Sequence, residues 1–252
     1  YVTVEAPDLK FNEKDYETAC RLAADAIREM LSPKPEHVTL VVGLGNRNVT
    51  PDALGPAAVD RLMITTHMKK HMPEYLDDSI GGVCAIIPGV LGTTGLESAE
   101  IVGGVVKEAK PDAVIAIDAL AARSPDRLST TIQIGNTGIR PGAGIGNRRG
   151  GLSQEALGVP VIAIGVPTVI DASTIVQDTV FQIVQAIEES KLPEQEREML
   201  IAKTLSQSID QMMVTPKDID LIIERAAKTV ANSINLALHR DLTFEDIENY
   251  VG

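Results

Sequence analysis

The sequence is poor in aromatic residues and in cysteine. Phe, Trp and Tyr make up 3% of its 252 residues, and tryptophan is absent. Because 44% of the residues are nonetheless hydrophobic, the core must consist mainly of aliphatic side chains, which suits buried parallel strands covered by helices. The two cysteines, Cys20 and Cys84, are too few for a disulfide framework. Cys84 lies in the apolar run VCAII, and we interpret it as a core residue rather than a nucleophile.

Positive charge and long apolar runs are also in short supply. The 23 Lys and Arg residues against 35 Asp and Glu give a net charge of −12. Proteins that bind a phosphate backbone need clustered positive charge, so we expect no direct nucleic-acid partner. No apolar run approaches the roughly 20 residues of a membrane span, and no secretory signal is visible. We therefore expect a cytoplasmic protein without a membrane partner.

Apolar runs alternate with amphipathic segments along most of the chain. Continuous aliphatic or β-branched runs predict strands at 38–42, 83–87, 113–117, 130–134 and 159–165. Amphipathic periodicity predicts helices at 12–31, 50–71, 96–110, 172–190 and 215–239. The alternation predicts a single domain over residues 1–252, with an α/β fold of three α/β/α layers around a mostly parallel central sheet.

Two carboxylates stand where a ligand crevice is expected. In open α/β sheets that crevice lies beyond the carboxyl ends of the strands. Asp52 follows the first predicted strand, where Thr50 and Pro51 predict the N-cap and first turn of a helix. Asp118 directly follows the run AVIAI. If the two preceding strands are neighbours in the sheet, these aspartates face one another across one crevice.

The surroundings of the two aspartates predict different protonation states. The partial positive charge of a helix N-terminus favours the ionised form of Asp52. An apolar strand and a like-charged neighbour favour the neutral form of Asp118. Such a pair supplies one base and one acid, as hydrolysis of an amide by an activated water requires. Each aspartate also has a purely structural interpretation, as a dipole complement in a first helical turn or as the N-cap of the segment that follows.

The stretch VVGLGNRN begins like a dinucleotide-binding loop. Gly43 and Gly45 follow the first strand, but Asn48 occupies the place of the third glycine, and no acidic ribose partner follows the strand at 83–87. We interpret the glycines as a tight turn that aims Asp52 and whose backbone N–H groups could bind a peptide carbonyl. A non-catalytic module that binds a nucleotide or another small molecule is an alternative.

Metal ligands are not evident. His67 and His71 are one helical turn apart, but the glutamate of the zinc-protease pattern is missing and two lysines lie between them. We expect no metal site and no cofactor. The glycine-rich stretch GIRPGAGIGNRRGG, which contains Arg140, predicts an exposed connection or a lid that contacts a peptide.

Six sequence blocks together resemble the germination proteases of spore-forming bacteria. They occur in the same order and span nearly the whole chain: VVGLGNRNVTPDALGPAAVD, IPGVLGTTGLE, PDAVIAIDALAARS, PVIAIGVPTVIDA, MVTPKDID and NSINLALH. Several of these blocks are long and unusual, which makes the resemblance specific.

The resemblance implies an endopeptidase that cleaves small acid-soluble spore proteins during germination, in the cytoplasm of the spore core. It implies a fold shared with hydrogenase maturation proteases, an inactive zymogen with an N-terminal propeptide expected before this chain, and a homo-oligomer, a tetramer. The two essential carboxylates of this atypical aspartic peptidase family correspond to Asp52 and Asp118. We further expect a group of residues to contact substrate, namely Gly43, Gly45, Asn46, Thr93, Thr94 and Glu97.

The residues also permit other functions. A metal-dependent maturation protease of the same fold would use the same carboxylates together with a histidine, although none is close to either aspartate in the sequence. A peptide-binding scaffold without turnover is a further alternative.

Overall fold

A computed structural model describes residues 1–6, 13–140, 150–186 and 212–251. The described part of the chain forms one seven-stranded sheet in the order β1-β5-β6-β4-β2-β3, with β7 paired to β6. The strands are β1 Val2–Glu5, β2 Val38–Gly43, β3 Gly82–Ile86, β4 Ala113–Ala122, β5 Thr131–Gly135, β6 Val161–Asp171 and β7 Met213–Val214. Strands β3, β2, β4 and β6 are mutually parallel, whereas β1, β5 and β7 pair antiparallel.

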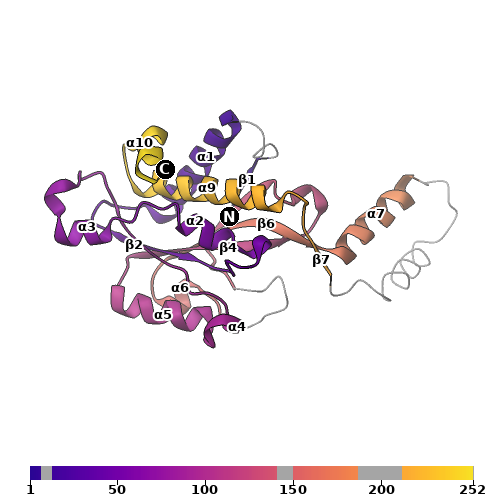
Figure 1. Cartoon of the computed structure of the whole chain (residues 1–252), viewed down its shortest axis with the longest axis horizontal. Coiled ribbons are helices and arrows are strands. Elements are labelled where there is room, and N and C mark those ends of the chain that lie inside the picture. Colours follow the sequence, from indigo (N-terminus) through magenta and orange to yellow (C-terminus); the bar gives the residue numbers. More distant parts are fainter. Residues whose placement is uncertain (7–12, 141–149, 187–211, 252) are drawn as a thin grey trace.

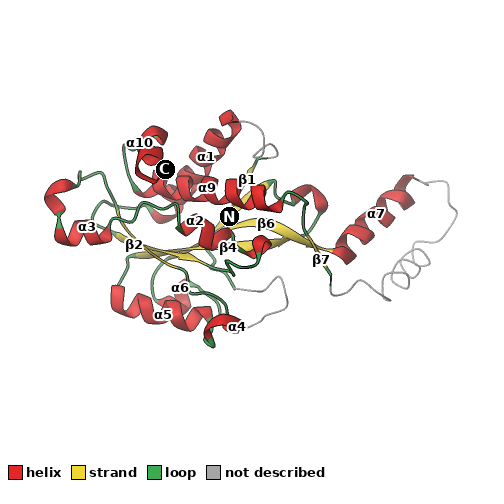
Figure 2. Cartoon of the chain, in the orientation of Figure 1, coloured by secondary structure: helices red, strands yellow, loops and turns green. Residues whose placement is uncertain are grey.

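Helices cover both faces of this sheet, which gives the predicted three layers (Figures 1 and 2). One face packs against α1 (Glu13–Leu31), α2 (Leu54–Val59) and α9 (Ile219–Leu238). The other face packs against α5 (Ser98–Ala109) and α6 (Gln154–Leu157). Because successive side chains of a strand point to opposite faces, each central strand contributes to both cores.

Strand β2 shows this alternation within five residues. Val41 belongs to the larger core beneath α1, α2 and α9, whereas Leu40 and Val42 belong to the smaller core beneath α5 and α6. All three side chains are almost completely buried. A continuous aliphatic run therefore marks a strand covered on both faces, as the sequence predicts.

Helix α9 is the central element of the larger layer. Every residue from Thr229 to Leu238 is buried, including Asn232 and Asn235. The Asn235 side chain accepts a hydrogen bond from the Met63 backbone N–H at 3.0 Å and donates one to the Arg61 carbonyl at 3.1 Å. A buried amide is tolerated here because its polar atoms have partners.

The predicted helix over residues 50–71 is wrong. The segment contains a 3-10 turn η1 (Thr50–Asp52), the short helix α2, and a separate helix α3 (Thr66–His71). The N-cap of η1 is Val49, not Thr50. The helix is interrupted after α2 because the backbone of residues 61 and 63 bonds to the Asn235 side chain. Tertiary hydrogen bonds thus override the helical periodicity of this segment.

Other boundaries also differ from the sequence prediction. Strand β4 runs on to Ala122 because its pairing with β6 continues past Asp118, so Asp118 lies within the strand and does not follow it. The predicted helix at 96–110 begins two residues later, at Ser98, and the short helix α4 (Leu91–Thr94) precedes it. Helix α9 begins at Ile219 rather than at the Thr-Pro pair of residues 215–216.

The periphery holds elements that the sequence did not indicate. Strands β1 and β7 and helix α10 (Phe244–Val251) are all short. The helix predicted at 172–190 is present as α7 (Ala172–Ala186), which extends away from the body of the molecule (Figure 1). The last four residues of the helix predicted at 172–190, and residues 141–149 of the glycine-rich stretch, lie outside the described residues. Among the described residues, none of the helices combines the length and apolar character that a membrane span needs.

Candidate active site

Strands β2 and β4 are direct neighbours, which meets the condition for the two aspartates to share a crevice. Asp118 sits in the carboxyl-terminal half of β4, opposite Gly165 of β6. Its side chain is 7% exposed, and its Oδ1 atom accepts a hydrogen bond from the Ala119 backbone N–H at 3.0 Å. The central position of β4 in the sheet therefore buries this carboxyl group almost completely.

Asp52 is the last residue of the turn η1, which follows β2. The Asn46 backbone N–H donates to Asp52 Oδ2 at 2.7 Å and to the Asp52 carbonyl at 3.1 Å. Asn46 is therefore a direct support of the carboxylate. Its own Oδ1 atom accepts from the Asn48 N–H at 3.0 Å, which stabilises the loop locally.

The glycines of this loop are required by close backbone approach. Gly45 has a φ of 107°, and a Cβ atom there would lie 2.0 Å from the Asp52 carbonyl oxygen. A Cβ atom on Gly43 would lie 2.5 Å from the carbonyl oxygen of Gly55 in α2. The pattern that begins like a nucleotide-binding loop thus lets the chain turn back on itself and places Asp52 beside β4.

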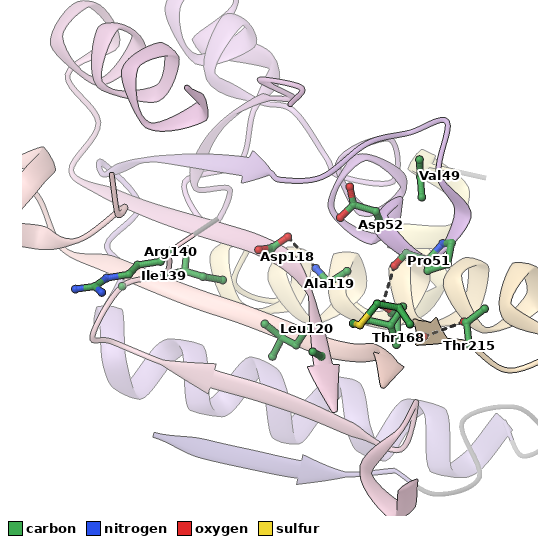
Figure 3. A pocket seen from close by; sticks show the side chains of 14 residues that line it. Val49, Pro51, Asp52, Asp118, Ala119, Leu120, Ile139, Arg140, Thr168 and Thr215 are labelled. Carbon is green, nitrogen blue, oxygen red and sulfur yellow. Dashed lines mark hydrogen bonds between the residues drawn. The ribbon is translucent and has the colours of Figure 1, made fainter. Parts of the chain in front are cut away.

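A cavity of about 620 Å³ contains both carboxyl groups (Figure 3). It lies at the carboxyl ends of the parallel strands β4 and β6, where ligand crevices of α/β sheets occur. Apolar groups dominate its wall. The lining residues are Val49, Pro51, Asp52, Asp118, Ala119, Leu120, Ala121, Gly138, Ile139, Arg140, Thr168, Val169, Met213 and Thr215.

Burial raises the pKa of both acids, but to different degrees. Burial is the main cause at Asp118, the negative charge of Asp52 adds to it, and together they raise the Asp118 pKa to about 7. Burial also raises the pKa of Asp52, and the hydrogen bond from the Asn46 backbone partly offsets this. The expectation that the start of a helix would favour ionised Asp52 is thus reversed in direction. The pair still separates into a strongly and a less strongly perturbed acid.

The other predicted contact residues divide into two groups. Gly45 and Asn46 contact Asp52, Gly43 packs against Gly55 in α2, and none of the three is among the described residues that line the cavity. Thr93 and Thr94 bond the backbone at Val90 around helix α4. These two threonines and Glu97 are not among the described residues that line the cavity.

Several lining residues carried no clear signal in the sequence. Thr168 lies inside an aliphatic strand, and the sequence pattern predicts Thr215 as the start of a helix. Arg140 belongs to the glycine-rich stretch that predicts an exposed connection or a lid contacting a peptide, and it lines the cavity. These residues come together because β6, β7 and the segment after β5 converge at the same end of the sheet.

The donor set around the cavity does not resemble a metal centre. The described part of the chain contains no group of three or more His, Cys, Asp or Glu side chains arranged to hold a metal ion. His239 is buried, its backbone forms a β-bridge with Ile80, and it is not among the described residues that line the cavity.

Fold and cavity together define an α/β protein with two carboxyl groups in one pocket at the carboxyl ends of its parallel strands, an arrangement suited to general acid–base chemistry. The sequence profile described as germination protease matches residues 1–190 and 189–251 of the chain. The chain therefore belongs to the germination protease family, a family of peptidases.

Individual relatives agree with this assignment. The germination protease of Caldanaerobacter subterraneus subsp. tengcongensis is 48% identical over 260 residues, covering 98% of this chain and 80% of the relative. That of Clostridium acetobutylicum is 43% identical over 268 residues, covering 100% and 82%. That of Bacillus subtilis is 41% identical over 296 residues, covering 99% and 80%.

Proposed function

We propose that this protein is an endopeptidase that cleaves small acid-soluble spore proteins during spore germination, with Asp52 and Asp118 activating a water molecule. The observation that carries the proposal is the presence of two acids with unequally raised pKa values in one cavity. Membership in the germination protease family supports the same reaction class. The cavity volume of about 620 Å³ also lies in the range of roughly 300–1,000 Å³ typical of ligand pockets.

The unequal pKa values suggest the role of each acid. Asp118, the more deeply buried, holds the proton near neutral pH. Asp52, supported by the Asn46 N–H, is the ionised base. In the first step Asp52 takes a proton from water while the water oxygen bonds to the peptide carbonyl carbon. Asp118 donates its proton to the carbonyl oxygen as that oxygen becomes a hydroxyl group.

The second step restores both acids. The carbon–nitrogen bond breaks, the proton on Asp52 passes to the leaving nitrogen, and the hydroxyl returns a proton to Asp118. No net proton is gained or lost by the pair. The burial of Asp118 and the nearby charge of Asp52 favour the neutral form of Asp118 before substrate binds.

The resemblance also leads us to propose a zymogen and a homotetramer in the spore core. Helix α7 supports an assembly because it extends from the body and leaves Phe181 58% exposed. Light scattering after size exclusion tests this part, since a tetramer has four times the mass of one chain. A monomeric mass at micromolar concentration would contradict the tetramer without affecting the peptidase.

The test of the reaction is cleavage of a purified small acid-soluble spore protein by the full-length protein. Wild type, Asp52→Asn and Asp118→Asn are compared. Asp25→Asn in helix α1 is the matched control, since Asp25 is exposed and forms an ion pair with Arg28 one helical turn away. We expect both site variants to lose cleavage and the control to keep it. Cleavage that survives in either site variant would remove that aspartate from the mechanism.

The same assay separates the alternatives. Loss of wild-type cleavage on addition of EDTA would favour a metal-dependent protease. Thermal stabilisation by a nucleotide, without any cleavage, would favour a binding module. Chelator-insensitive cleavage that requires both aspartates supports the proposed enzyme.

A further inference from the structure

Thr168 occupies an irregularity of the sheet directly beside the proposed catalytic pair. Along β4 and β6 the register runs from Asp118 opposite Gly165 to Leu120 opposite Pro167. The next pair is Ala121 opposite Val169, so Thr168 is an extra residue without a partner on β4. Such bulges often occur next to active sites, where they redirect a side chain.

The redirected side chain makes a specific long-range bond. Thr168 is completely buried, and its hydroxyl donates to the carbonyl oxygen of Pro51 at 2.7 Å (Figure 3). Pro51 precedes Asp52 within the turn η1. This bond therefore connects η1, which carries Asp52, to β6. Strand β6 pairs in turn with β4, which carries Asp118.

A second threonine holds the bulged residue from the other side. The hydroxyl of Thr215, which follows β7, donates to the Thr168 carbonyl at 2.9 Å. β7 itself pairs with the end of β6. Thr168 is thus hydrogen-bonded through both its carbonyl and its hydroxyl, which joins β7, β6 and η1 at this residue.

We propose that Thr168 is a positioning residue, whose hydroxyl bond to Pro51 sets the placement of Asp52 relative to Asp118. The inference rests on the proposed two-aspartate mechanism and deepens it. Without the hydroxyl, the Pro51 carbonyl loses this partner and η1 is free to move away from β4. A displacement of about 1 Å at a reacting group can cost roughly a hundredfold in rate.

The placement of Asp52 also affects the titration of Asp118. The ionisable groups among the described cavity residues are Asp52 on η1, Asp118 on β4 and Arg140 after β5. The charge of Asp52 contributes to the raised pKa of Asp118. If η1 moves away, this contribution weakens and Asp118 loses its proton at a lower pH. The alkaline limb of the pH–rate profile, where Asp118 would no longer be an acid, then shifts down.

The experiment compares Thr168→Val, Thr168→Ser and wild type in cleavage of a purified small acid-soluble spore protein. Valine keeps the β-branched shape without the hydroxyl, and serine keeps the hydroxyl. We expect Thr168→Val to lower kcat about tenfold with KM within about twofold, and to move the alkaline limb down by about half a pH unit. Thr168→Ser should stay within about threefold of wild type.

Thr229→Val in α9 is the matched control. Thr229 is equally buried and its hydroxyl also donates to a backbone carbonyl, that of Arg225 at 2.8 Å, but it does not line the cavity. Assays run at least 15 °C below the lowest Tm of the set, with Tm measured for each variant, so that folded enzyme is compared throughout. The control should lose stability but keep kcat and the pH profile.

Three results would overturn the inference: an unchanged kcat and alkaline limb in Thr168→Val, a loss no larger than in Thr229→Val, or failure of serine to restore the rate. Failure of the proposed function looks different: the wild type would then not cleave the spore protein, or Asp118→Asn or Asp52→Asn would still cleave it. Inactive aspartate variants together with an unaffected Thr168→Val would reject the positioning role alone.

Discussion

Asp118 and His239 are both buried ionisable groups, and only Asp118 has the features of a site. Asp118 lies at the carboxyl end of β4, beside a second acid, and lines a cavity. His239 follows the end of α9, is 0% exposed, and is not among the described residues that line the cavity. Burial favours the neutral form of both groups, raising the pKa of Asp118 to about 7 and lowering that of His239 to about 4.

The difference teaches that a perturbed pKa does not mark a catalytic group by itself. His239 is enclosed by protein, so no substrate atom can reach it. Asp118 faces an open volume together with a residue that can hold the complementary protonation state. A functional interpretation needs the perturbed group, the space in front of it and the second group.

The largest expected effect distinguishes the two regions by activity. Asp118→Asn should lower kcat/KM at least about a hundredfold, since it removes a general acid. His239→Gln should leave kcat/KM within about threefold of wild type under conditions where the variant is folded. Both are measured by cleavage of a small acid-soluble spore protein. Comparable losses of kcat/KM in the two variants would contradict the view that only Asp118 is catalytic.

Asp118→Asn should lower activity but raise the stability of the folded protein at alkaline pH. The folded-state pKa of Asp118 is raised, so its contribution to stability is present below its unfolded pKa of 3.8 and is lost as pH rises through about 7. At pH 8 the enzyme therefore bears the cost of a buried charge. We expect Asp118→Asn to raise the free energy of unfolding at pH 8 by up to about 4 kcal/mol, measured in urea. A less stable variant at pH 8 would contradict this account.

His239 should give the reverse pH dependence. Burial is the main cause of its lowered pKa, and the positive charge of Lys69 adds to it. The unfolded chain then binds more protons between about pH 4 and 6.5, so stability falls as pH drops through that window. Across this window the free energy of unfolding should decrease by up to about 3 kcal/mol.

Two variants separate these opposing slopes. His239→Gln removes the pH dependence of stability that His239 causes. The unfolding free energy of this variant should therefore fall less between pH 7 and pH 4.5 than that of wild type. Asp118→Asn removes the opposing contribution of Asp118, so the unfolding free energy of that variant should fall more steeply as pH is lowered. Urea unfolding at a series of pH values measures both. Parallel curves for wild type and His239→Gln would mean that His239 does not titrate as described.

The smallest expected effect concerns the loop behind Asp52. Gly45→Ala places a Cβ atom against the Asp52 carbonyl at a positive φ, and should cost about 1–3 kcal/mol of stability and part of the activity. Gly104→Ala in α5 is the matched control, because a Cβ atom there meets nothing within 4 Å, and alanine should add about 0.5–1 kcal/mol. Equal effects of the two substitutions would show that the loop is not tightly packed.

Sequence reasoning succeeded where one local signal decided the outcome. The five predicted strands exist, because continuous aliphatic runs are stable only when covered on both faces. It failed at residues 50–71, where bonds from Asn235 in α9 interrupt the helix, and at Asp118, where pairing with β6 prolongs β4. In each failure the deciding partner is more than 40 residues away in the chain.

The sequence by itself determined the α/β class, the parallel core, the two aspartates as candidates and membership in a peptidase family, because these depend on residue type and order. Tertiary structure decided which groups meet. It placed Thr168, Arg140 and Thr215 around the aspartates, moved Thr93 and Thr94 to the cap of α4, and buried Asp118 more deeply than Asp52. Burial and contact depend on strand order and register, which no short stretch of sequence encodes.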